Sequence, residues 1–191
     1  MKAVIVAFDR FTDVDVFLPW DLLSRVRFRE KDFSVRLVGP GKSHKSVCGL
    51  DLPMHGALEE CNDADLVYFS SGPGTRTLIK DHATMSRLKL YPDKQVICSM
   101  CSGALILGSL GILNGISATT YPSAVEELRG FGVEVEMNKH LVTHGNIGTA
   151  AGCLAAVDLM GWAIEKIYGA EIRQAVIASV QPVGQGLKCL N

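Results

Sequence analysis

The sequence predicts an α/β fold, a doubly wound and mostly parallel β-sheet with helices on both faces. Short apolar runs rich in β-branched residues alternate with longer amphipathic segments along the 191 residues. This alternation is typical of parallel strands joined by crossover helices. The runs are almost continuously apolar, as expected of strands that are buried on both faces. The chain has the length of one domain, residues 1–191, and contains no repeat or linker.

The strands are expected where β-branched or aromatic residues cluster, and the helices where apolar residues recur at helical spacing. The expected strands are 3–8, 33–39, 65–71, 95–100 and 116–121. The expected helices are 14–26, 74–91 with a break near residue 81, 102–113, 123–129 and 148–168. The last helix carries apolar residues widely around its circumference and should be largely buried. Segments 45–56 and 133–146 alternate like hairpins, and the tail 181–191 is expected to be irregular.

Composition excludes several classes of partner. Nineteen basic and twenty acidic residues give a formal net charge of -1 without a long run of either sign. Neither a nucleic acid nor an anionic membrane surface is indicated, which leaves a small molecule or another protein as the expected partner, and a small-molecule substrate is predicted. The N-terminal apolar run, residues 3–8, is too short for a signal peptide or a membrane span, so a cytoplasmic protein is expected.

The six cysteines are expected to be reduced thiols, because nothing in the sequence indicates export. Cys98 and Cys101 form the one CxxC pair, and no second Cys or His pair follows at zinc-finger spacing. A structural zinc site is therefore not expected, and neither a metal nor a cofactor is predicted.

The most informative turn joins the strand 95–100 to the helix that follows it. Residues 99–103 read Ser-Met-Cys-Ser-Gly, with small residues two positions before and after Cys101. A nucleophile elbow needs such neighbours, because the nucleophile sits in a strained backbone conformation between strand and helix. At a helix N-terminus the pKa of Cys101 should be lowered. The alternative for Cys101 is a small buried hydrophobe.

Strand alternation puts Cys98 on the opposite face of the strand from Cys101, which favours a core role for Cys98.

The chain resembles the ThiJ/PfpI superfamily (class I glutamine amidotransferase-like), and within it the branch that includes isonitrile hydratase. The matching segments are DVDVFLPWDLL (13–23), SSGPGTRTLI (70–79), ICSMCSGALILGSLGILNGISATTY (97–121) and GNIGTAAGCLAAVD (145–158). They occur in the order found in the family and cover much of the chain. The resemblance implies a flavodoxin-like fold and a homodimer.

The resemblance also implies roles for individual residues. The elbow nucleophile maps to Cys101, and the acidic partner four positions before a proline maps to Asp15, which precedes Pro19. Ser102 keeps the hydroxyl of a catalytic threonine. Ser71 and Gly72 stand where the family has a Gly-Gly turn whose N–H groups face the site. An ionised Asp15 would oppose formation of the Cys101 thiolate, so we expect a coupled pair that shares a proton.

The main departure from the family is Tyr121. Relatives that act as deglycases, glyoxalases or peptidases have a histidine at this point, and a cysteine hydrolase needs such a base. The five histidines, His44, His55, His82, His140 and His144, are expected to be surface or core residues. Peptide hydrolysis is correspondingly disfavoured, and Tyr121 is expected to contact the substrate.

Two functional hypotheses follow. The first is a cysteine-dependent small-molecule hydratase or hydrolase resembling isonitrile hydratase, a lyase that converts an isonitrile and water into an N-substituted formamide. The alternative is a redox-responsive, chaperone-like or deglycase-type protein in which Cys101 is oxidised to a sulfinate. A transcription factor with a helix-turn-helix region is not expected, because little sequence follows Gln181.

Overall fold

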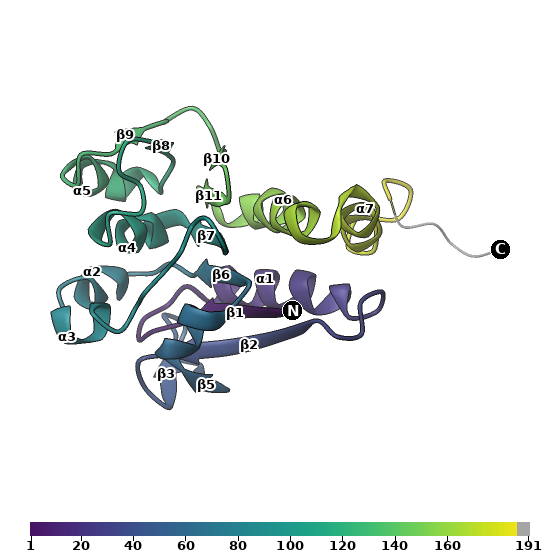
Figure 1. Ribbon diagram of the computed structural model, residues 1–191, viewed down its shortest axis with the longest axis horizontal. Helices are drawn as coiled ribbons and strands as arrows, with labels where there is room; N and C mark the ends of the chain where they lie inside the picture. Colours follow the sequence, from purple (N-terminus) through teal and green to yellow (C-terminus); the bar gives the residue numbers. More distant parts are fainter. Residues whose placement is uncertain (187–191) are drawn as a thin grey trace.

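The computed structural model describes residues 1–186, and a mostly parallel seven-stranded sheet forms its centre (Figure 1). The strand order is β10-β11-β7-β6-β1-β2-β5. The strands are β1 (Lys2–Val6), β2 (Ser34–Gly39), β5 (Gly56–Ala57), β6 (Leu66–Phe69), β7 (Val96–Met100), β10 (Leu141–His144) and β11 (Ile147–Ala150). Neighbouring strands pair in parallel, except that β10 is antiparallel to β11 at the edge. The predicted α/β fold is confirmed.

Helices cover both faces of this sheet. One layer contains α1 (Asp13–Val26), α6 (Ala156–Tyr168) and α7 (Ala170–Ala178), which pack against one another. The other contains α2 (Thr75–Leu78), α3 (His82–Met85), α4 (Ala104–Ser109), α5 (Val125–Arg129) and the 3₁₀ helix η1 (Leu58–Asp63). Along β1, Ala3 and Ile5 belong to the core of the first layer, and Val4 and Val6 to that of the second. This double burial explains why the strand is continuously apolar.

The strand expected at 116–121 is wrong as part of the main sheet. Only β8 (Ser117–Ala118) is extended, and it pairs with β9 (Glu134–Val135) in a separate two-stranded sheet. Beyond it, Thr119 donates its backbone N–H to the side-chain oxygen of Thr149. Side-chain hydrogen bonds thus replace a strand ladder at this point.

The helix expected at 148–168 is wrong over its first residues. Residues 147–150 form β11, and α6 begins only at Ala156. A Cβ on Gly148 would lie 2.6 Å from the Trp162 ring, so the lack of a side chain lets α6 pack closely on the strand. Gly169, with φ of 83°, separates α6 from α7, a helix that the sequence did not predict. The expected irregular tail lies partly outside the described residues.

The remaining elements differ from the predicted ones mainly in the residues at which they begin and end. The break expected near residue 81 separates α2 from α3, where the Asp81 carboxylate accepts the Thr84 N–H. Instead of a helix over 102–113, a 3₁₀ turn over Cys101–Gly103 precedes the short α4. The hairpin expected at 45–56 is present as β3 (Ser43–Lys45) and β4 (Asp51–Pro53). In the 133–146 segment, β10 pairs with β11 rather than with β9.

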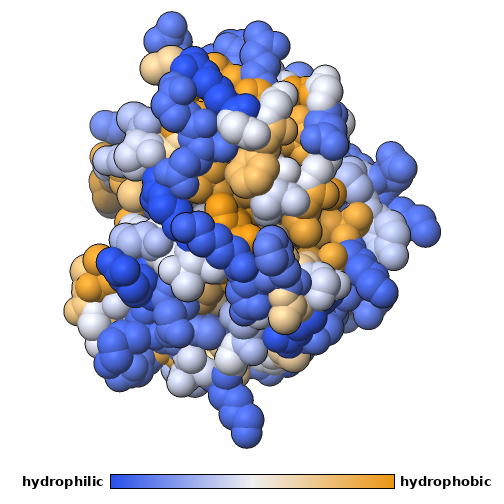
Figure 2. All heavy atoms as spheres, turned by 90° about the vertical axis from the view of Figure 1, so that its left-hand side faces the viewer, coloured by the Kyte–Doolittle hydropathy of each residue, from blue (hydrophilic) through white to orange (hydrophobic). Residues whose placement is uncertain are grey.

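The surface on the side of α2, α3, α5 and β9 is mostly hydrophilic, with hydrophobic residues gathered in its middle (Figure 2). Within residues 1–186, every helix is too short or too polar to cross a lipid bilayer.

Candidate active site

The chain turns sharply at Cys101, directly after β7. Its φ of 48° lies in the left-handed region, and Arg10 is the one other non-glycine residue with positive φ in the described part of the chain. This conformation costs about 1–2 kcal/mol for a residue with a side chain. The structure thus contains the strained strand-to-helix turn expected of a nucleophile elbow.

Gly103 gives this turn the room it needs. A Cβ at this position would lie 2.6 Å from the Ser70 carbonyl oxygen and 2.9 Å from that of Phe69. Both contacts are with backbone atoms of the neighbouring β6 region, which cannot move aside without disturbing the sheet.

We therefore expect Gly103→Ala to lower the free energy of unfolding by about 1–3 kcal/mol, as other overpacking substitutions do. Gly161→Ala is the matched control, because a Cβ inside α6 would meet no atom closer than 3.4 Å and alanine favours a helix. Urea denaturation of the two variants measures the difference. Equal stabilities would contradict this account of the elbow.

Cys98 is completely buried and does not line the pocket at Cys101. Burial raises the pKa of its thiol. The core role predicted for Cys98 agrees with this position, but the parity argument behind it is wrong. Both cysteines contact the core on the α1 and α6 side, because the chain leaves the strand geometry at the elbow.

Asp15, on the first turn of α1, is completely buried beside the elbow. The Ser71 hydroxyl donates a hydrogen bond of 2.5 Å to its Oδ2, and the Tyr68 hydroxyl donates one of 2.7 Å to its backbone carbonyl. Its Oδ1 has no hydrogen-bond partner among the described residues. One carboxylate oxygen is thus fixed in place, and the other is left to interact with the neighbouring thiols.

Ser102 belongs to a second small network. Its Oγ accepts the backbone N–H of Gly72 at 3.2 Å and lies 3.1 Å from the Thr75 hydroxyl. The Gly72 N–H, which the family resemblance led us to expect facing the substrate, therefore contacts Ser102 here. The Ser71 hydroxyl, also expected near the substrate, is used to hold Asp15.

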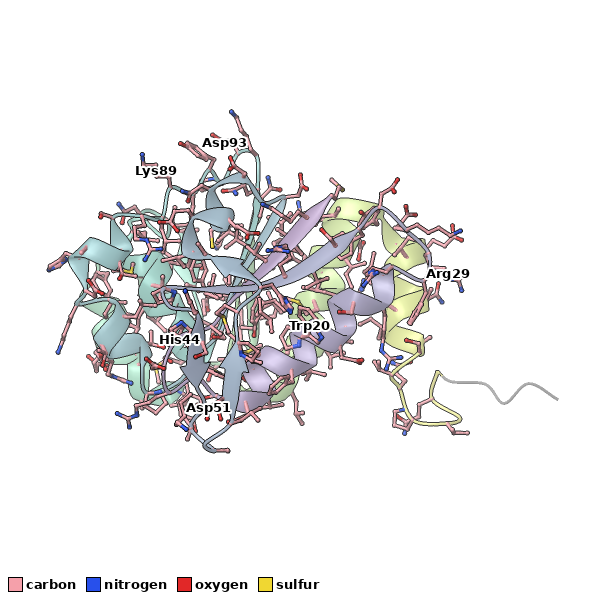
Figure 3. All side chains as sticks on the ribbon, turned by 90° about the horizontal axis from the view of Figure 1, so that it is seen from below. Trp20, Arg29, His44, Asp51, Lys89 and Asp93 are labelled. Carbon is pink, nitrogen blue, oxygen red and sulfur yellow. The ribbon has the colours of Figure 1, made fainter. Side chains whose placement is uncertain are left out.

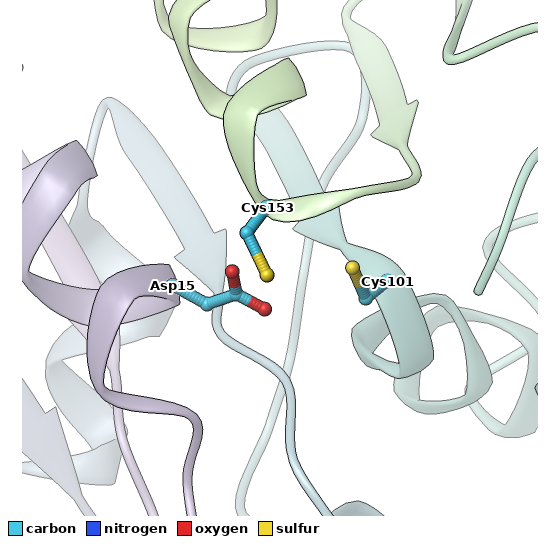
Figure 4. A group of neighbouring side chains, drawn as sticks. All are labelled: Asp15, Cys101 and Cys153. Carbon is cyan, nitrogen blue, oxygen red and sulfur yellow. The ribbon is translucent and has the colours of Figure 1, made fainter.

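Cys153 is a member of the site that the sequence analysis missed. Its Sγ, the Sγ of Cys101 and a carboxylate oxygen of Asp15 all lie within 4.8 Å of one another (Figure 4). Among the described residues, these three form the one group of His, Cys, Asp or Glu side chains that lie close enough together to hold a metal ion. Two sulfur atoms and one carboxylate would suit Zn²⁺. Had β11 been recognised, Cys153 would have stood out shortly after the end of a parallel strand, where sites form.

A pocket of about 310 Å³ opens onto these groups. It is lined by Thr12, Asp15, Ser71, Gly72, Pro73, Arg76, Cys101, Ser102, Tyr121, Ser123 and Cys153. All six residues that the sequence singled out therefore lie around one pocket. Tyr121 is 49% exposed and belongs to the open part of the lining. This volume is at the lower end of the range for small-molecule sites.

No histidine lines this pocket, and the structure describes all five. His44, for example, lies in the β3–β4 hairpin (Figure 3), where its Nε2 accepts the Gly41 N–H at 3.0 Å. His140 is 3.0 Å from Asp158 at an exposed position. A general acid or base in the pocket would therefore have to be another side chain. Asp15 is the one carboxylate among the lining residues.

Burial, and after it the charge of Asp15, raises the pKa of the Cys101 thiol to about 12. The direction is opposite to the lowering expected from a helix N-terminus. The helix that follows is only six residues long, and its dipole does not offset the loss of water around the thiol. Burial and Asp15 also raise the pKa of Cys153, to about 11. Both thiols are therefore protonated at neutral pH.

This raised pKa predicts the pH dependence of Cys101 alkylation. Iodoacetamide reacts with the thiolate, so its rate at Cys101 should still rise about tenfold per pH unit between about pH 7 and pH 10. Peptide mapping by mass spectrometry separates Cys101 from the other cysteines. In Asp15→Asn the rate profile of Cys101 should move to lower pH, because the second-largest cause of its raised pKa is removed. A wild-type rate that levels off below about pH 8 would contradict the raised pKa.

The chain is similar to several known proteins. A sequence model of the DJ-1/PfpI family matches residues 1–166. The chain is 26% identical over 171 residues to the isonitrile hydratase of Pseudomonas putida, covering 88% of this chain and 73% of that protein. It is 28% identical over 155 residues to a deglycase of Pyrococcus abyssi, covering 76% and 87%.

Solved structures show the same fold. DJ-1 of Schizosaccharomyces pombe superimposes with a TM-score of 0.81 at 18% identity, over 96% of this chain and all of that one. A ThiJ/PfpI family protein of Pseudomonas syringae gives 0.81 at 22% identity, over 96% and 76%.

Proposed function

Because this chain belongs to the DJ-1/PfpI family, we propose that it is a cysteine-dependent hydratase that adds water to a small molecule such as an isonitrile. The observation that carries the proposal is the pairing of Cys101 with Asp15 at a small pocket without a histidine. By the family resemblance, deglycases of this superfamily have a histidine at the position where this chain has Tyr121. Hydration of an isonitrile releases no leaving group, and one shared proton suffices for its first step.

In the proposed mechanism, the proton shared by Cys101 and Asp15 is transferred to the terminal carbon of the isonitrile, and the Cys101 sulfur bonds to that carbon. Water then adds to the resulting thioimidate carbon, and one of its protons passes through Asp15 to the nitrogen. The carbon–sulfur bond breaks as the new hydroxyl group becomes the carbonyl and gives its proton to the thiolate, so that the N-substituted formamide leaves and the thiol is restored. The unpartnered Oδ1 of Asp15 is the atom free to carry this proton.

The other residues of the pocket position these groups. Ser71 orients the Asp15 carboxylate through its hydrogen bond to Oδ2. Ser102, bonded to the Gly72 N–H, orients water or the intermediate. Tyr121 contacts the substituent of the substrate at the open part of the pocket. No residue in this scheme requires a bound cofactor.

The test is turnover by the purified protein of a panel of isonitriles of increasing size, followed by formamide formation. We expect turnover of small isonitriles and a fall in rate once the substituent exceeds the pocket. A panel of glyoxal-modified amines serves as the comparison, since two of the relatives are deglycases. Absence of isonitrile turnover, or faster turnover of the modified amines, would overturn the proposal.

A second candidate function is a redox-responsive protein in which Cys101 is oxidised to a sulfinate, favoured by its place in a pocket open to small molecules. Intact mass after mild peroxide treatment tests it, because a sulfinate adds two oxygen atoms to Cys101. An unmodified thiol would exclude this function.

For assembly we propose a cytoplasmic homodimer, as the family resemblance implies. Val14 and Phe17 on α1 are apolar side chains that are 39% and 37% exposed and that a second copy of the chain could cover. Sedimentation equilibrium measures the assembly, and a monomer at micromolar concentration would contradict it.

A further inference from the structure

We propose that Cys101 and Cys153 form a reversible disulfide when the pocket admits a hydroperoxide. Cys153 thereby acquires a role as the second thiol of a redox pair. The inference does not depend on the substrate of the proposed hydratase.

The backbone brings the two cysteines together. Cys101 follows Met100, the last residue of β7, and Cys153 lies three residues after Ala150, the last residue of β11. Met100 and Ala150 are paired in the parallel ladder between these strands. Neighbouring strands are about 4.8 Å apart, and a disulfide spans Cα atoms about 4.4–6.8 Å apart. The two chain segments thus leave the sheet at a separation that a disulfide can bridge.

The side chains point into the same space. Figure 4 shows Cys101 and Cys153 on facing elements, with the sulfur of Cys153 directed toward the Asp15 carboxylate. The sulfur atoms lie within 4.8 Å of each other. A disulfide requires about 2.05 Å between them, so one of the two segments must shift.

Cys153 is on the segment that can move. It begins the short 3₁₀ turn Cys153–Ala155, and Gly152 before it has a φ of 88° with no atom within 4 Å of a Cβ position. Leu154, the next residue, is 79% exposed. Cys101, by contrast, is held in the elbow, where its carbonyl accepts the Thr120 hydroxyl at 2.8 Å.

The other described cysteines are not placed to compete. Cys61 and Cys98 are completely buried in the core, and Cys48 is exposed with its N–H bonded to Asp13. Among the described cysteines, only Cys101 and Cys153 line the pocket. The pair is therefore specific to this site.

The chemistry balances with the hydroperoxide as the named oxidant. A thiolate of the pair attacks the peroxide, so that the O–O bond breaks, a sulfenic acid forms and an alcohol or water is released. The second thiol loses its proton to Asp15 and attacks the sulfenic sulfur, so that the S–O bond breaks, the S–S bond forms and water leaves. The two sulfur atoms together lose two electrons, and the peroxide gains them. Oxidation of either thiol leads to the same disulfide.

Such a bond consumes the proposed nucleophile reversibly. It also removes the sulfenic acid before a second peroxide can oxidise it to a sulfinate, which thiol reductants do not reverse. Cys153 would therefore protect Cys101 from irreversible oxidation.

The test treats the purified protein with one equivalent and then an excess of hydrogen peroxide, in the presence of a chelator. We expect the wild type to lose the mass of two hydrogen atoms, a non-reduced digest to join the Cys101 and Cys153 peptides, and dithiothreitol to restore the mass. Cys153→Val should instead gain oxygen atoms on Cys101. Cys48→Ser is the matched control and should behave as the wild type.

The outcomes separate cleanly. A sulfinate on Cys101 of the wild type with Cys153 still alkylatable, or a disulfide that includes another cysteine, would overturn the inference. If Cys153→Val does not fold, Cys153→Ala and the peptide map of the wild type carry the test. Because the readout is mass and contains no isonitrile, failure of the hydratase proposal leaves it unaffected.

Discussion

Replacement of Cys101 by alanine is expected to lower the rate of isonitrile hydration at least about 1,000-fold, since it removes the sulfur that bonds to the substrate carbon. The loss should appear in kcat, because the pocket that binds the substituent stays intact. The Cys101 side chain is small and buried among core residues, so the variant should still fold. Steady-state kinetics together with far-UV circular dichroism measures both effects.

Cys48→Ala is the control for this variant, because Cys48 is exposed and does not line the pocket. Its activity should equal that of the wild type. If Cys101→Ala kept a tenth or more of the wild-type rate, covalent catalysis by this thiol would be ruled out.

Asp15→Asn is expected to lower kcat about 100- to 10,000-fold, the usual contribution of a general acid and base. The amide has the shape of the carboxylate and can still accept the Ser71 hydroxyl, but it cannot carry a proton to or from the substrate. The variant also replaces a completely buried carboxylate whose Oδ1 has no partner. A buried charge without compensation is costly, so the free energy of unfolding should stay the same or rise.

Activity assays and urea denaturation of Asp15→Asn test both halves of this prediction. Asp13→Asn, on the same turn of α1 but outside the pocket lining, is the matched control and should keep wild-type kcat. A fully active Asp15→Asn variant would remove Asp15 from the mechanism, and an unfolded one would contradict the predicted stability.

The sequence predicted the sheet well where strands are buried on both faces. β1, β6 and β7 are almost entirely buried and mostly apolar, a pattern typical of strands covered on both faces. β2 contains Ser34 and Arg36 and is buried only from Leu37 onward. β11 was missed because Gly148, Thr149 and Ala150 are small and favour no such pattern, and because the apolar residues of α6 follow directly. Its identity as a strand depends on pairing with β7 and on packing under Trp162, which are tertiary contacts.

The same limit applied to the site. The elbow sequence and the family resemblance led to Cys101, Asp15, Ser102, Ser71, Gly72 and Tyr121, and the structure gathers all six around one pocket. Cys153 was missed together with β11. The direction of the Cys101 pKa was also wrong, because the helix N-terminus is visible in the sequence whereas the burial that outweighs it arises only on folding.

The hydrogen bonds of Ser71 and Ser102 could likewise not be predicted from the sequence. Ser71 bonds to a residue 56 positions away and Ser102 to one 30 positions away. Such contacts follow from the way strands are ordered in the sheet. Spacing along the chain gives no sign of them.

Covalent catalysis by Cys101 is the central claim, and acid-quenched intact mass spectrometry during isonitrile turnover tests it most directly. Addition of the thiol to an isonitrile releases nothing, so the intermediate should add the full mass of one substrate molecule to the protein. Peptide mapping should place it on Cys101. Formamide production at the full wild-type rate by protein whose Cys101 has been alkylated beforehand would contradict the claim.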